Sequence, residues 1–176
     1  RPEVLMDIPE AETVLLACQA LERQGAFKSV ELSMMLTRSF VVLAPFDQAK
    51  VRKIREARTA DAKSQGASRF QQMWYAAQAP FALIDGYSGM TLADVQVELP
   101  TTRVVGYADI EQITLLESTP PPPARFGPRT PGEPPHKLML TTTTGEISLQ
   151  VDGHTDPREL RRLLRGIAGD RFVGGQ

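Results

Sequence analysis

The chain has 176 residues, of which 41% are hydrophobic and 23% charged, which is ordinary for a soluble globular protein with one core. Its net charge of -1 excludes a general attraction to nucleic acid or to an anionic membrane, so any electrostatic function must be local. No run of residues approaches the roughly 18 apolar residues that span a bilayer, and no signal peptide is recognisable. The single cysteine, Cys18, cannot form an internal disulfide, which fits a cytoplasmic protein, and its apolar neighbours predict a buried, unreactive thiol.

The first 45 residues predict three strands. Residues 13–21 fit either a helix or a buried strand, and we assign them to a strand because a hairpin follows. Residues 29–36 alternate in polarity, and residues 39–45 form an apolar run rich in β-branched side chains. Because only the short connection Thr37–Ser39 separates the two runs, they predict an antiparallel hairpin.

Residues 47–100 predict helices instead of strands. The helix expected over residues 48–63 is rich in Lys, Arg and Ala and has only a thin apolar stripe, so it should be largely solvated. In a second helix after it, four side chains at i, i+3, i+4 and i+7 predict a buried face: Phe70, Met73, Trp74 and Ala77. Pro80 is expected to end this helix, residues 80–89 to form a loop, and residues 91–99 to form a short helix.

The last third predicts four strands and a helix. The strands are expected at residues 102–106, 110–117, 137–142 and 146–151. Between the second and the third of them, residues 119–135 are rich in proline, which lacks a backbone donor, and predict an extended, solvated loop. Asp156 and Pro157 suit the start of a final helix whose apolar stripe contains Leu160 and Leu164, and Gly169 suits its end.

Seven strands followed by a helix resemble the pleckstrin-homology (PH) superfold. The segment Leu36–Val42 (LTRSFVV) is similar to a strand-to-strand turn of bacterial PH-like domains, and Tyr107–Ile113 (YADIEQI) is similar to their entry into a strand. The resemblance covers residues 14–44 and 103–168. It implies an α+β fold: an antiparallel PH-like β-barrel or sandwich of about seven strands whose C-terminal helix caps one open end.

The resemblance also implies a single PH-like domain over residues 1–176, with two additions. One is a helical insertion at about 47–100, where that fold usually has a tight hairpin, and the other is the proline-rich loop at about 119–135. The lipid-binding role of PH domains is not carried over, because the first hairpin loop offers only Arg23 and Lys28 as cations.

Basic residues gather on the first predicted helix. Four of them form a candidate site for an anionic surface: Lys50, Arg52, Lys53 and Arg55. The alternative is a solvated helix whose cations need no partner.

A second candidate site is apolar. The helical spacing places Trp74 in the core, whereas its neighbour Tyr75 points in another direction and could contact a partner. Together with Phe70 and Phe81, these residues are predicted to form a patch that packs against another subunit or protein.

No motif for catalysis, a cofactor or a metal is found. The segment Ile84–Met90 lacks the second glycine of a G-x-S-x-G elbow, and no phosphate-binding glycine loop occurs. Two histidines and no spare cysteine do not predict a zinc site. We therefore predict no catalytic residue, no cofactor and no metal.

The sequence thus favours a non-enzymatic interaction or adaptor domain that is cytoplasmic and binds a protein partner or self-associates. One alternative is a module that docks peripherally on anionic lipid through the basic helix, and its binding would depend on salt. Another is a small enzyme or ligand-binding domain with a pocket near Trp74, Asp85 and Tyr87. No nucleic-acid partner is expected.

Overall fold

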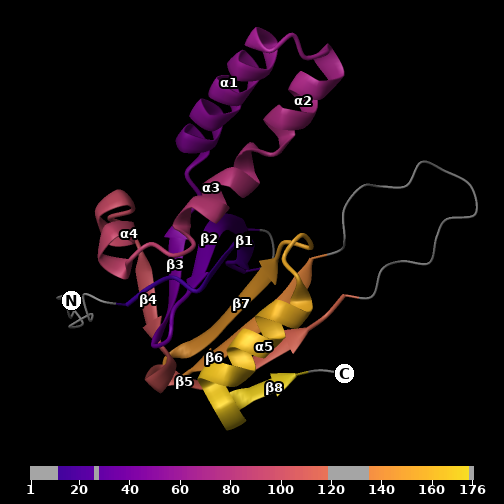
Figure 1. Ribbon diagram of the computed structural model, residues 1–176. Helices are drawn as coiled ribbons and strands as arrows, with labels where there is room; N and C mark the ends of the chain where they lie inside the picture. The colour runs from indigo at the N-terminus through magenta and orange to yellow at the C-terminus, as the bar shows by residue number, and fades with distance from the viewer. Residues whose placement is uncertain (1–11, 26–27, 119–134, 175–176) are drawn as a thin grey trace, which may run out of the picture.

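The structure is a computed structural model that describes residues 12–25, 28–118 and 135–174, and eight strands in these residues form one sheet. Along the sheet the order is β4-β3-β2-β1-β7-β6-β5-β8 (Figure 1). The strands are β1 (Leu16–Arg23), β2 (Ser29–Leu36), β3 (Phe40–Pro45), β4 (Arg103–Gly106), β5 (Ile110–Leu116), β6 (His136–Thr142), β7 (Gly145–Val151) and β8 (Phe172–Gly174). All seven predicted strands are present, and β8 is an addition that the sequence reasoning missed.

The prediction of a seven-stranded antiparallel PH-like barrel is wrong. The sheet is open and mixed: β4 and β8 each pair with one neighbour, and β8 runs parallel to β5, with Ile113 opposite Phe172. After the last helix the chain turns and places β8 beside β5. In a closed barrel the free edge of β5 would have to pair with β4, but here β8 occupies that edge. The coarser prediction of an α+β fold stands.

Five α-helices occur in the described residues: α1 (Gln48–Ser64), α2 (Arg69–Ala77), α3 (Ala79–Tyr87), α4 (Leu92–Glu98) and α5 (Pro157–Ala168). Four of them were predicted. The fifth, α3, replaces the loop expected over residues 80–89. Pro80 lies at the start of α3, where its missing N–H costs no hydrogen bond, so it begins a helix there. The proline-rich loop predicted at about 119–135 lies, apart from Pro135, outside the described residues.

The sheet has a core on each of its two faces. On one face, Leu160 and Leu164 of α5 pack with apolar side chains from β1 to β3 and from β5 to β7. On the other, α3, α4 and the start of α1 cover the half of the sheet formed by β1 to β4. Strand β2 is buried on both sides, with Met34 in the first core and Met35 in the second.

Helices α1 and α2 form an antiparallel pair, residues 48–78, which we call the helical hairpin. Figure 1 shows that it projects beyond the sheet, on the far side of α3 from α5. Near the sheet, Val51 of α1 is buried in the second core, whereas no residue of α2 is buried. The α2 half of the hairpin therefore contributes no buried side chain to either core.

Candidate docking surface

Local interactions hold α2 in place against α1. Gly66, whose φ is 74°, turns the chain between the two helices in a conformation that suits glycine. A capping box then starts α2: the Ser68 hydroxyl accepts from the Gln71 backbone N–H (3.3 Å), and the Gln71 side chain accepts from the Ser68 backbone N–H (2.9 Å). These bonds define α2 without any contact with the sheet.

Helix α2 carries four exposed large apolar side chains. Their exposed fractions are 70% for Phe70, 65% for Met73, 61% for Trp74 and 45% for Tyr75. The prediction of a buried face, with Trp74 in the core, is wrong because no third element among the described residues covers α2. One feature of the sequence indicated this exposure: the thin apolar stripe of α1 offers too little surface to cover three aromatic rings. The expected exposure of Tyr75 is confirmed.

The four predicted interface residues divide between two neighbouring hollows. Phe70, Trp74 and Tyr75 line a shallow hollow of about 360 Å³ on α2. Phe81 of α3 is half-buried and lines a groove of about 680 Å³ below the hairpin. Its ring lies edge-on to the ring of His154, with 4.5 Å between the two ring centroids. Trp74 lines both hollows and therefore joins the two parts of the predicted patch.

The basic residues predicted on α1 are not equivalent. The Lys50 ammonium lies 2.6 Å from the Glu98 carboxylate of α4, and this hydrogen bond raises the pKa of Lys50. Arg52, Lys53 and Arg55 are exposed and form no ion pair with any residue that the structure describes. Lys50 thus forms an ion pair between the first turn of α1 and α4. The other three cations remain available to an anionic surface.

The hairpin and the remainder of the chain have opposite charges. Residues 48–78 contain seven Lys and Arg residues against two acidic residues, Glu56 and Asp61, which gives +5. The other residues contain 13 cationic and 19 acidic side chains, which gives -6. A net charge of -1 therefore conceals a strongly basic projection on an acidic body.

The predicted pocket near Trp74, Asp85 and Tyr87 forms only in part. Trp74 and Asp85 line the groove below the hairpin, together with Arg58 and His154. Tyr87 is not part of it: its side chain is buried in the second core, and burial raises its pKa. Its hydroxyl has no hydrogen-bond partner among the described residues.

Cys18 is buried, as predicted, below a smaller hollow of about 250 Å³ between β1, α3 and the start of α5. Burial raises the pKa of its thiol to about 12, although a hydrogen bond with Thr155 opposes part of the shift. A thiol in this state is a poor nucleophile. In the described part of the chain, no group of three or more His, Cys, Asp or Glu side chains could hold a metal ion.

The described segments contain no helix with the length and apolar character needed to cross a membrane. No protein-family model and no curated protein sequence matches the chain.

Two solved structures are similar in backbone arrangement. The C-terminal domain of an unknown protein from Leishmania infantum aligns with a TM-score of 0.41 and 9% identity, over 89% of this chain and 84% of that chain. The hSac2 domain of the human phosphoinositide phosphatase Sac2 aligns with a TM-score of 0.40 and 11% identity, over 96% of this chain and 80% of that chain. These matches do not confirm the bacterial PH-like resemblance.

Proposed function

We propose that this protein is a non-enzymatic interaction domain that engages its partner through the helical hairpin. One observation carries the proposal: α2 exposes between 45% and 70% of four large apolar side chains, and three of them, Phe70, Trp74 and Tyr75, line one hollow. Single exposed apolar residues are normal on protein surfaces, but a contiguous apolar patch on a projecting element is typical of an interaction site.

Two kinds of partner fit this surface. A protein, or a second copy of the chain, could cover Phe70, Trp74 and Tyr75 with an apolar face of its own. The second candidate is peripheral docking on an anionic membrane, which the hairpin's net charge of +5 favours.

Site-specific photocrosslinking in cells that produce the protein would test the proposal. A photoreactive phenylalanine analogue at Phe70 is compared with the same analogue at Val97 on α4, where an isolated side chain is 84% exposed. We expect an adduct with protein or lipid from position 70 that disappears with Trp74→Ser, and no such adduct from position 97. Equal adducts from both positions, or none from position 70, would show that the hairpin is not the docking element.

A further inference from the structure

We infer that the hairpin's partner is an anionic membrane surface, on which the cations of the hairpin meet lipid headgroups while the aromatic side chains of α2 enter the interface. This inference rests on the proposed function, because it takes the hairpin as the docking element and adds the chemistry of what it docks on.

Exposed cations are concentrated on the hairpin. Five of its seven basic side chains are exposed and form no ion pair with described residues: Arg52, Lys53, Arg55, Lys63 and Arg69. Each Lys or Arg close to an anionic leaflet strengthens binding by about fivefold at physiological salt. Several such charges on one projecting element therefore supply an attraction that the chain's overall charge of -1 does not suggest.

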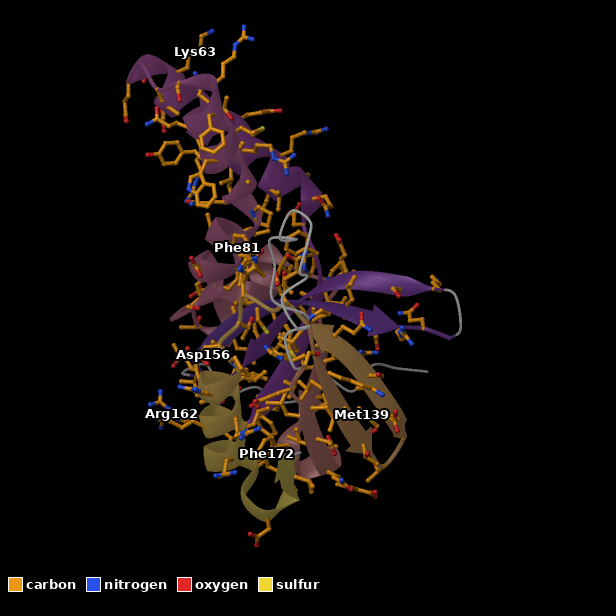
Figure 2. The ribbon with its side chains drawn as sticks, turned by 90° about the vertical axis from the view of Figure 1, so that its right-hand side faces the viewer. Lys63, Phe81, Met139, Asp156, Arg162 and Phe172 are labelled. Atoms are coloured by element: carbon orange, nitrogen blue, oxygen red, sulfur yellow. The ribbon has the colours of Figure 1, made fainter. Side chains whose placement is uncertain are left out.

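The charge distribution also fixes how the molecule would approach a membrane. Figure 2 places Lys63 at the far end of the hairpin, with Phe81 between it and Asp156 at the start of α5. The part of the chain outside the hairpin carries -6, so an anionic surface would repel it. An approach with the hairpin in front brings opposite charges together.

The apolar side chains of α2 are of the kind found at membrane interfaces. Trp and Tyr combine an apolar ring with a polar edge and gather at the level of lipid headgroups. Phe and Met add apolar surface, so that a basic element bearing such a face resembles helices that lie in the interface plane. A lipid surface also adapts its shape to a projecting face, whereas a protein would need a matching groove.

A second copy of the chain fits this face less well. In a two-fold symmetric dimer the same patch on each subunit would form the contact. Such a dimer would bring two hairpins, each with a net charge of +5, against each other, and this repulsion opposes association.

Vesicle binding tests the inference with a probe that the chain already contains. Trp74 is the only tryptophan and lies on the proposed contact face, so its emission reports directly on whether that face leaves water. Vesicles of phosphatidylcholine alone are compared with vesicles that also contain phosphatidylserine, at low and at high salt, by co-sedimentation and by Trp74 emission. We expect binding and a blue shift with the phosphatidylserine vesicles only, both weakened by salt.

Three variants separate charge, apolar contact and unspecific effects. Arg52→Glu with Lys53→Glu lowers the charge of the hairpin by four units and, at about fivefold per unit, should weaken binding by roughly six-hundredfold. Phe70→Ser should reduce the blue shift of Trp74 at equal saturation. The matched control, Arg158→Glu with Arg162→Glu, makes the same change of charge on the exposed side of α5 and should bind within about threefold of the wild type.

Other results would overturn the inference in distinguishable ways. Salt-independent binding to both vesicle types, or equal binding of single-stranded RNA, would exclude recognition of anionic lipid. A blue shift that grows with protein concentration in the absence of vesicles would identify a second copy as the partner and leave the proposed function standing. If Trp74 stays in water throughout and no crosslink forms at position 70, both the inference and the proposed function fail.

Discussion

The environment of Cys18 makes a quantitative prediction about reactivity. An ordinary thiol with a pKa of 9.0 is about one-tenth ionised at pH 8, whereas a thiol with a pKa of about 12 is ionised in about one molecule in ten thousand. Because the thiolate is the reactive form, native Cys18 should react at least about a thousandfold more slowly than the unfolded chain. Its side chain is also only 2% exposed, which further limits access by a reagent.

The assay is alkylation by iodoacetamide at pH 8, followed by mass spectrometry, with and without denaturant. A variant with Cys18→Ser and Val97→Cys serves as the control, because an isolated, exposed thiol on α4 should react rapidly in the native protein. Any slow native reaction should follow the opening of the fold and accelerate when the protein is destabilised. If the folded protein, with an unchanged circular dichroism spectrum, reacts within about tenfold of the unfolded rate, the argument from burial is wrong.

Three further predictions concern stability. Burial raises the pKa of both Tyr87 and Tyr107, so the folded state keeps protons that the unfolded chain releases at high pH. Denaturant titrations at a series of pH values should therefore show the full free energy of unfolding below about pH 9 and a steady loss above it. A free energy of unfolding that does not change with pH would contradict this. Leu164→Ala leaves a cavity between α5 and the sheet and should lower the free energy of unfolding by about 2 to 5 kcal/mol, as measured by chemical denaturation; a loss under about 1 kcal/mol would mean that this core is loosely packed. Asp47→Ala removes the carboxylate that accepts from the Lys50 backbone N–H at 2.9 Å and should cost about 1 kcal/mol, whereas Asp47→Ser should retain most of the stability.

Most of the local structure could be predicted from the sequence because its causes are local. Alternating polarity revealed β2, an apolar run rich in β-branched side chains revealed β3, and the cap and proline at Asp156 and Pro157 marked the start of α5. Strand β8 was missed because its three residues are too few to show alternation. Helix α3 was missed because Pro80 was taken as a helix breaker, although proline is favoured in a first turn.

The long-range features could not be predicted in the same way. Whether a sheet closes depends on which strands occupy its edges, and the parallel pairing of β8 with β5 joins residues far apart in the chain. Likewise, the bond between Lys50 and Glu98 spans 48 residues, so the sequence could not show that this one cation is already engaged. For Trp74, periodicity showed which side chains share a face of α2 but not whether another element covers that face.

The hairpin combines two features that would each be a liability alone. An uncovered row of aromatic side chains favours unspecific association, and a dense cluster of cations opposes the packing of one copy against another. Together they restrain self-association while keeping an attraction for surfaces that are anionic and can take up apolar groups. Because caps and a glycine turn hold α2 without help from the sheet, its apolar face is not needed for the core. Folding therefore does not account for that face, whereas the proposed docking would.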